Sequence, residues 1–313
     1  MVTVIIVNWN AGSLLSDCLL SIKQFGGHGV AKVVVVDNGS TDGSVEAIER
    51  LEIPKLETVR MYENVGFARA CNAGASRVST DFMLFLNPDA RLSEHTLENS
   101  LQAMKNRSHA RVAIVGARLI DASGQVARSC ARFPNTFRFI AYALGIDRLA
   151  PKLGYCMVDW DHNESRMVDH VIGAFFLIRT QAFVEAGGFD ETFFVYLEDL
   201  DLSVAVSQRG WQSWYESTSV AFHVGGGTSA QAKPQRLFYS LRSRILYARK
   251  HLCCLGYTTV TATTLLIEPC ARLAAAGMRR DIDMARETRD AYRWLWHWFL
   301  TGCKQNGAIS PPR

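Results

Sequence analysis

Short apolar runs alternate with segments of helical periodicity over the first ninety residues of the chain. The apolar runs occupy residues 2–9, 32–37, 56–62 and 82–86, and the periodic segments occupy residues 12–25, 43–51 and 67–78. Because runs such as the four valines at 33–36 are apolar throughout, they predict strands that are covered on both faces. We therefore expect an α/β fold in which helices sandwich a mostly parallel sheet.

The pattern becomes less regular after residue 90. We expect helices over residues 93–105, 180–186 and 198–209, and strands over residues 112–120, 168–179 and 212–223. Glycines at 225–227 interrupt the pattern, and helical segments follow over residues 235–251 and 267–300. The sequence therefore predicts a body over residues 1–230 and a helical extension over residues 231–313.

Charge separates the extension from the body. The 313 residues are 48% hydrophobic and 20% charged, which excludes a disordered or fibrous chain. The extension has 14 basic and 5 acidic residues, net +9, whereas the rest has 20 and 25, net −5. A basic, aromatic-rich tail predicts an anionic partner. We expect no nucleic acid, because no recognition module is visible.

Cysteine usage and the absence of targeting signals bear on the compartment. The eight cysteines form no CxxC pair and lack the spacing of a zinc site or disulfide framework, so we expect reduced thiols in the cytoplasm. The chain opens directly on an apolar run without a basic segment, so we expect no secretory signal. No eighteen apolar residues follow one another, so we expect no spanning helix.

Polar residues follow each of the first four predicted strands, at residues 8–10, 37–42, 63–66 and 87–89. In an open parallel sheet, ligands bind beyond the carboxyl ends of the strands. Turn formation or helix capping is the alternative for residues 37–42, and a turn is the alternative for Asp89. Four polar strand ends together favour a binding site.

The phosphate-binding loops of other nucleotide proteins are missing. No GxGxxG follows the first predicted strand, and no GxxxxGK[ST] occurs anywhere, which disfavours a Rossmann oxidoreductase and a P-loop protein. The phosphates of a bound nucleotide must then be neutralised in another way. A divalent metal held by Asp89 is the simplest candidate.

Five segments, in this order, resemble the family 2 glycosyltransferases, whose fold is GT-A and Rossmann-like. They read VNWN at 7–10, VDNGSTD at 36–42, NVGFARACN at 64–72, FLNPD at 85–89 and YLEDLDL at 196–202. The resemblance covers about residues 1–250 and is closest to the rhamnosyltransferase-like branch that extends bacterial surface polysaccharides. It implies a GT-A catalytic domain with a nucleotide-binding half over residues 1–90 and an acceptor-side half over residues 91–230.

The resemblance implies a set of donor-binding residues. Asp37 would receive the nucleobase edge of a nucleoside-diphosphate sugar, and Asn8 and Arg69 would line the same pocket. We place Gly66 and Asn87, which belong to the matching segments, with them. Asp37 favours a pyrimidine base without separating uracil from thymine.

The metal site follows from the same resemblance. Asn87-Pro88-Asp89 takes the place of a DxD motif with asparagine in its first position, so Asp89, the diphosphate oxygens and water would hold Mg²⁺ or Mn²⁺. In several relatives a histidine at the position of His223 completes the site, and the glycines at 225–227 would allow a close approach to the diphosphate. A histidine satisfied within the core is the alternative for His223.

A general base is expected at the start of the helix predicted from residue 198. By resemblance, Asp199 deprotonates an acceptor hydroxyl and Glu198 orients the acceptor or the base. One base acting opposite the leaving group implies inversion at the anomeric carbon. Since acidic residues stabilise the first turn of any helix, a well-capped helix is the alternative.

We expect two further contacts from the extension, one with a phosphate and one with a membrane surface. Arg242 or Arg244 would contact the donor diphosphate or an acceptor phosphate, with an amphipathic surface helix as the alternative. The final helix, with its tryptophans and arginines, would lie at an anionic membrane surface, with packing in a homodimer as the alternative.

These observations predict an inverting, metal-dependent glycosyltransferase at the inner face of the cell membrane. The most specific expectation is transfer of L-rhamnose from dTDP-rhamnose to a lipid-linked saccharide. A transferase that uses a UDP-sugar and a non-catalytic sugar-nucleotide-binding protein on the same fold are the alternatives. The second would have lost a base or a metal ligand, yet Asp199 and Asp89 are both present.

Overall fold

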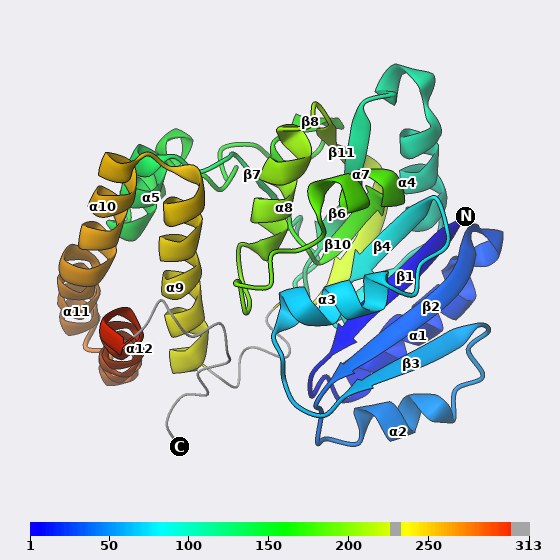
Figure 1. The fold of residues 1–313 in the computed structure, drawn as a ribbon, viewed down its shortest axis with the longest axis horizontal. Coiled ribbons are helices and arrows are strands. Elements are labelled where there is room, and N and C mark those ends of the chain that lie inside the picture. Colours follow the sequence, from blue (N-terminus) through cyan, green and yellow to red (C-terminus); the bar gives the residue numbers. More distant parts are fainter. Residues whose placement is uncertain (226–232, 302–313) are drawn as a thin grey trace. The chain divides into compact units, whose positions relative to one another are not determined.

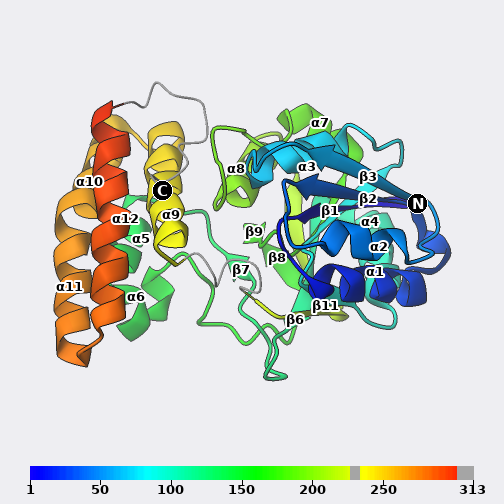
Figure 2. The same ribbon diagram turned by 90° about the horizontal axis from the view of Figure 1, so that it is seen from below.

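The computed structural model describes residues 1–225 and 233–301, and Figures 1 and 2 show its elements in two views. The chain forms two compact units, which we treat one at a time. The sheet unit comprises Met1–Phe133, Cys156–Glu191 and Asp199–Thr228, and the helical unit comprises Pro134–Tyr155, Thr192–Glu198 and Ser229–Arg313.

The described part of the sheet unit contains a nine-stranded sheet of order β3-β2-β1-β4-β10-β6-β11-β5, in which β8 also pairs with β11. The strands are β1 (Val2–Asn8), β2 (Val30–Asn38), β3 (Leu56–Met61), β4 (Phe82–Leu86), β5 (Ala90–Leu92), β6 (Val112–Ile120), β8 (Arg166–Val168), β10 (Phe175–Arg179) and β11 (Gln212–His223). A small second sheet pairs β7 (Cys130–Ala131) with β9 (His170–Val171).

Strand direction explains where the sheet can hold a ligand. Strands β1 to β4 run the same way, as do β6 and β11, whereas β10 inserts antiparallel between β4 and β6. The expectation of a mostly parallel sheet is confirmed, with antiparallel strands β5, β8 and β10 added. The segment expected as one strand over residues 168–179 is three short strands, separated at Asp169 and at residues 172–174.

Helices cover both faces of the sheet (Figure 2). One face carries α1 (Ser13–Phe25), α2 (Ser44–Glu49) and α4 (Thr96–Lys105), and the other carries α3 (Phe67–Ala75), α7 (Thr180–Ala186) and α8 (Glu198–Ser207). Along β2, Val33 and Val35 pack with the first set and Val34 and Val36 with the second. The unbroken valine run is therefore explained by burial on both sides.

The helical unit consists of antiparallel and connecting helices, coloured green and then yellow to red in Figure 1. They are α5 (Thr136–Ala143), α6 (Ile146–Leu149), α9 (Lys233–His251), α10 (Cys254–Ala262), a π-helical turn (Thr263–Ile267), α11 (Glu268–Arg279) and α12 (Ile282–Thr301). The single helix expected over residues 267–300 is divided at Arg280, whose φ of 54° ends α11.

The core of the helical unit shows which side of the final helix is buried. Tyr292, Leu295 and Trp298 of α12 pack against Phe238 and other apolar residues of α9. Trp298 is only 2% exposed, so this tryptophan belongs to the core and does not face outward. An amphipathic pattern in which aromatic residues lie on several sides of a helix does not reveal which side is buried.

Two segments from the predicted body belong to the helical unit. Phe194 stacks on Tyr239 of α9 with ring centroids 4.6 Å apart, which ties residues 192–198 to this unit. Phe139 packs edge-on against Tyr247 at 5.5 Å, which ties residues 134–155 to it as well. The helical unit is therefore larger than an extension that starts at residue 231. None of the helices described is both long and apolar enough to span a bilayer.

Candidate active site

The ends of β1 and β2 form the first part of the site. Asn8 and Asp37 are direct partners in the parallel pairing, and both are buried. Asn8 Nδ2 donates to Ser40 Oγ at 3.0 Å and to Ser44 Oγ at 2.9 Å, and Ser40 N donates to Asp37 Oδ1 at 3.1 Å. The loop after β2 is thus folded over the end of β1, so the turn chemistry of residues 37–42 holds Asp37 in place.

The loop after β3 closes against the loop after β2. Asn38 Nδ2 donates to Asn64 Oδ1 at 3.0 Å, and Gly66 N donates to the same oxygen at 3.0 Å. Gly39 has a φ of +76°, and a Cβ there would lie 2.8 Å from the carbonyl carbon of Glu63. Only glycine therefore allows these two loops to approach so closely.

Arg69 lies in the first turn of α3. Its Nε donates to Glu191 Oε2 at 2.9 Å, and both side chains are largely exposed. An exposed ion pair of this kind contributes little, about 0–1 kcal/mol. The pair therefore leaves the prediction of a donor contact for Arg69 open.

Asp89 and His223 meet at the other side of the site. Strand β5 pairs with β11 so that His223 lies opposite Ala90, and Val224 N donates to the Asp89 carbonyl oxygen at 3.1 Å. This pairing places His223 Nε2 3.3 Å from Asp89 Oδ1. The Asp89 side chain is 5% exposed and that of His223 is 14% exposed.

A carboxylate and an imidazole at this distance fit a divalent metal. Both groups are ligands of Mn²⁺, and carboxylate and water suit Mg²⁺. Within the described residues no cluster of three or more histidine, cysteine or acidic side chains fits a metal ion. The donor set therefore suits a metal that takes its remaining ligands from a diphosphate and from water.

Backbone N–H groups hold the carboxylate of Asp199. Gly173 N donates to Oδ2 at 2.7 Å and Leu200 N donates to Oδ1 at 2.8 Å. A Cβ on Gly173 would lie 3.2 Å from Oδ2, so a larger residue would press on the carboxylate. The Asp199 side chain keeps 17% of its surface exposed, which allows a substrate hydroxyl to reach it.

The entry to β10 connects Asp199 with the loop that carries Asp89. Leu86 at the end of β4 pairs with Phe175 at the start of β10, and Asn87 N donates to Ala174 O at 3.1 Å. Since Gly173 N holds Asp199, the two adjacent residues that precede β10 contact both Asp199 and the loop that carries Asp89. The strand order β2-β1-β4-β10 therefore brings Asp37, Asp89 and Asp199 to one edge of the sheet.

Glu198 precedes Asp199 and is the first residue of α8. Its side chain is buried, and the two residues before it, Tyr196 and Leu197, have φ values of 69° and 64°. Non-glycine residues in the left-handed region are uncommon and cluster at functional sites. The chain therefore enters α8 through a strained turn.

Sequence reasoning missed His170, which lies behind Asp199. Its Nδ1 is 2.9 Å from Ser203 Oγ and its Nε2 is 3.7 Å from Asp199 Oδ2. Burial lowers the pKa of His170, against the opposing charges of Asp199 and Asp169. A single histidine in an apolar stretch carries no periodic signal, and only its place three residues before Gly173 marks it.

The two arginines of α9 lie in the helical unit and differ from each other. Arg244 is buried, forms an ion pair with Glu268 and lies 5.4 Å from the ring of Tyr142. This buried pair occupies Arg244, so we do not retain it as a donor ligand. Arg242 lies over the ring of Trp298 at 5.5 Å, and its role as a phosphate contact stays a prediction.

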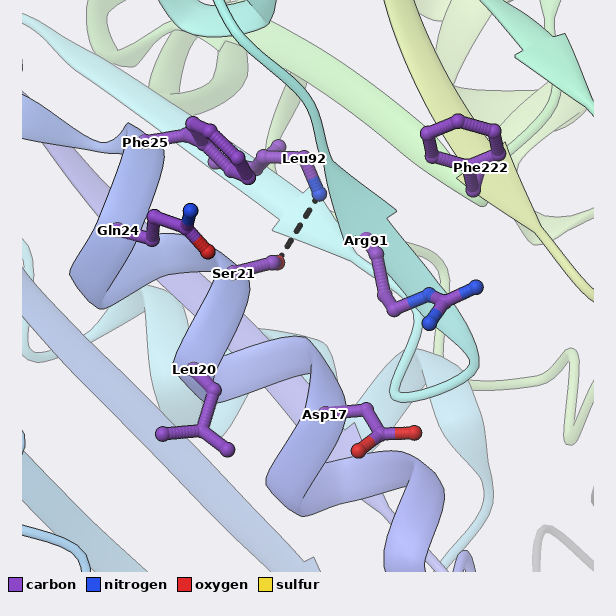
Figure 3. Close-up of a pocket in the computed structure, with 8 residues that line it drawn as sticks. All are labelled: Asp17, Leu20, Ser21, Gln24, Phe25, Arg91, Leu92 and Phe222. Atoms are coloured by element: carbon purple, nitrogen blue, oxygen red, sulfur yellow. Dashed lines mark hydrogen bonds between the residues drawn. The ribbon is translucent and has the colours of Figure 1, made fainter.

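A shallow pocket of about 340 Å³ lies elsewhere on the sheet unit, along α1, β5 and β11 (Figure 3). Ser21 Oγ accepts a hydrogen bond from Leu92 N at 3.0 Å, and Arg91 and Phe222 lie on the neighbouring strands. None of the predicted site residues lines this pocket. The candidate site at the ends of β1, β2 and β4 therefore does not coincide with this pocket.

Comparison with known proteins shows which sequences this chain resembles. Residues 3–157 match the model of Glycosyl transferase family 2. The chain is 26% identical over 264 residues to the N-acetylglucosaminyl-diphospho-decaprenol L-rhamnosyltransferase of Mycobacterium tuberculosis, covering 79% of this chain and 84% of the relative. It is 28% identical over 175 residues to Rhamnosyltransferase WbbL of Escherichia coli, covering 55% and 63%.

Solved structures share the fold. The mannosyltransferase PcManGT from Pyrobaculum calidifontis, in complex with GDP-Man and Mn²⁺, matches with a TM-score of 0.57 and 18% identity over 94% of this chain and 83% of that chain. TarS 1–349 from S. aureus, in complex with UDP-GlcNAc, matches with a TM-score of 0.56 and 13% identity over 94% and 91%. At these identities the likeness concerns the fold alone, and it confirms the expected GT-A architecture.

Proposed function

Because this chain belongs to the family 2 glycosyltransferases, we propose that it transfers L-rhamnose from dTDP-rhamnose to a lipid-linked saccharide, with inversion at the anomeric carbon. The rhamnosyltransferases that it resembles support the sugar, and the decaprenol-linked substrate in the name of one of them supports the acceptor class. The observation that carries the chemistry is the connection of Asp199 and the Asn87–Asp89 loop to Gly173 and Ala174, the two adjacent residues before β10.

We assign the donor to the ends of β1, β2 and β4. Asp37, held by Ser40 and paired with Asn8, accepts hydrogen bonds from the edge of the pyrimidine base. Gly66 and Arg69, at the start of α3, and Asn87, directly after β4, complete the donor site in this proposal.

Asp89 and His223 would hold Mg²⁺ or Mn²⁺, which when bound neutralises charge on the departing nucleoside diphosphate. Asp199 removes the proton of the acceptor hydroxyl as its oxygen attacks the anomeric carbon opposite the leaving group. Attack from that side inverts the configuration. Glu198 orients the acceptor or Asp199 in this scheme.

Donor identity can be tested by thermal shift with a panel of dTDP-, UDP- and GDP-sugars in Mn²⁺. We expect dTDP-rhamnose to raise Tm most, since a ligand at 100 times its Kd stabilises the native state by about 2.7 kcal/mol. The shift should disappear with EDTA and in Asp37→Ala, and it should persist in Asp121→Asn, a change in an exposed turn. A larger shift with a UDP-sugar would replace the proposed donor, and no shift with any donor would refute nucleotide-sugar binding.

We propose that exposed apolar residues of α10, the π-turn and α11 form one face that contacts the membrane. Residues 252–267 contain no acidic or basic residue, and several apolar side chains of this face are exposed. They are Leu255 at 77%, Leu266 at 58%, Ile267 at 52%, Leu273 at 45% and Met278 at 83%. Arg249 precedes this stretch and Arg279 and Arg280 follow it, which complements an anionic lipid surface at the inner face of the membrane.

The membrane contact can be tested by co-sedimentation with phosphatidylglycerol and phosphatidylcholine vesicles. Leu255→Glu combined with Leu266→Glu should weaken binding by about tenfold or more, since each buried leucine contributes about 1.5–3 kcal/mol. Val184→Glu, which changes an exposed apolar residue of the sheet unit, is the matched control and should bind normally. Unchanged vesicle binding would refute this face. A change of mass in light scattering would assign it to a homodimer.

A further inference from the structure

We propose that His170 is a positioning residue for Asp199, and that its Nε2 accepts a hydrogen bond from this carboxyl group once the group carries the proton of the acceptor. The inference rests on the proposed role of Asp199 as the base. It adds a residue behind the base that does not touch the substrate.

All groups involved belong to the sheet unit. His170 lies on β9, opposite Ala131 of β7, and is 3% exposed. Its ring reaches α8 at two points, with Nδ1 2.9 Å from Ser203 Oγ and Nε2 3.7 Å from Asp199 Oδ2. Ser203 follows Asp199 by one helical turn, so the ring contacts the same side of α8 twice.

The hydrogen bonds of Ser203 define the tautomer of His170. Ser203 Oγ donates to the carbonyl oxygen of Asp199 at 3.0 Å, and a carbonyl oxygen can only accept. The hydroxyl proton of Ser203 is therefore committed, and its oxygen accepts from Nδ1–H of His170. A neutral ring that carries its proton on Nδ1 presents the lone pair of Nε2 to Asp199.

The environment keeps this ring neutral. Burial lowers the pKa of His170, although the charges of Asp199 and Asp169 act in the opposite direction. Asp169 Oδ2 itself accepts a hydrogen bond from Phe133 N at 2.9 Å. The ring can therefore accept at Nε2, which a protonated imidazolium could not do.

The proposed step balances as a proton transfer coupled to substitution. The O–H bond of the acceptor breaks, its proton passes to Asp199, and the oxygen forms the new bond to the anomeric carbon. The bond from that carbon to the diphosphate oxygen breaks, and the leaving group keeps the electron pair. A proton on Oδ2 then points toward Nε2, and the 3.7 Å separation shortens to about 2.8 Å.

A His170 ring with its proton on Nε2 would disfavour protonation of Asp199. With its proton on Nε2, the ring would donate to the carboxylate of Asp199 and stabilise the charged form, which opposes proton uptake. Ser203 prevents this by holding the proton on Nδ1. The serine hydroxyl thus determines that Nε2 of His170 accepts a hydrogen bond from Asp199 and does not donate one.

A set of variants tests the inference through steady-state rhamnosyl transfer. His170→Phe keeps an aromatic ring in the buried position but removes both nitrogens, and kcat should fall roughly 10- to 100-fold with an unchanged KM for the donor. His170→Gln, which returns a polar acceptor near the place of Nε2, should recover part of that loss. Ser203→Ala should lower kcat about fivefold, a smaller loss than that of His170→Phe.

His162→Phe is the matched control. His162 is also fully buried in the sheet unit, but its Nε2 accepts from Cys130 N at 3.3 Å and its Nδ1 lies 3.0 Å from the carbonyl oxygen of Trp160. It should lose stability, measured as Tm, while kcat stays near that of the unmodified enzyme.

The outcomes separate this inference from the proposed function. Equal kcat in His170→Phe and His162→Phe would make His170 a structural residue and overturn the inference. If His170→Phe does not fold, Ser203→Ala decides, and its full activity would also overturn the inference. Full turnover by Asp199→Asn would instead refute the base itself.

Discussion

Replacing Asp199 with asparagine is expected to lower kcat by about 10³-fold, because the amide cannot accept the proton of the acceptor hydroxyl. An asparagine has nearly the same volume, and its carbonyl oxygen can still accept from Gly173 N or Leu200 N. The site should therefore keep its shape and its affinity for the donor. Turnover in the presence of both substrates and calorimetric donor binding in Mn²⁺ measure the two quantities separately.

Asp121→Asn is the matched control, because it makes the same change from aspartate to asparagine outside the candidate site. Asp121 lies in an exposed turn, where it accepts hydrogen bonds from Ser123 and Gln125. Its replacement should leave both turnover and donor binding unchanged. Turnover by Asp199→Asn within tenfold of the unmodified enzyme would remove Asp199 from the role of base.

Removing the Asp89 carboxylate is expected to abolish the dependence of donor binding on Mn²⁺. In Asp89→Ala the affinity for the donor in Mn²⁺ should fall by more than about 100-fold, since changes even in outer-shell partners of metal ligands cost 10- to 100-fold. The fold should persist, because β5 and β11 pair through their backbones and Asp89 contributes its carbonyl oxygen to Val224 N.

His223→Ala should weaken the same metal titration by about tenfold, as expected for the loss of one of two protein ligands. His95→Ala, which changes an exposed histidine next to Glu98, serves as the control and should leave the titration unchanged. A normal titration in His223→Ala would make His223 a core residue. A normal titration in Asp89→Ala would exclude a metal site at the end of β4.

Local patterns were sufficient to predict the first half of the sheet. Strands β1 to β4 and helices α1 to α3 are close in sequence, and the valines at 33–36 show directly that both faces are covered. The polar strand ends could be recognised for the same reason, since each lies immediately after its strand. Parallel pairing then brings Asn8 beside Asp37 without further information.

Local patterns could not predict which segments far apart in the sequence pair or pack together. Nothing local indicates that β10 inserts antiparallel between β4 and β6, which is what brings Gly173 to the end of β4. Arg244 has the sequence environment of a surface residue, and its burial depends on Glu268, 24 positions later. His170 likewise becomes meaningful only when β9 and α8 pack together.

The peptide that joins Gly173 to Ala174 acts as a spacer of fixed length between Asp199 and the loop that carries Asp89. Gly173 N holds the Asp199 carboxylate and Ala174 O holds the loop that carries Asp89, so the separation of these two groups is set by the main chain. The loops after β2 and β3, to which we assign the nucleobase, can then vary without moving Asp199 relative to the loop that carries Asp89. An insertion at residue 173 or 174, by contrast, would change the distance between Asp199 and the loop that carries Asp89.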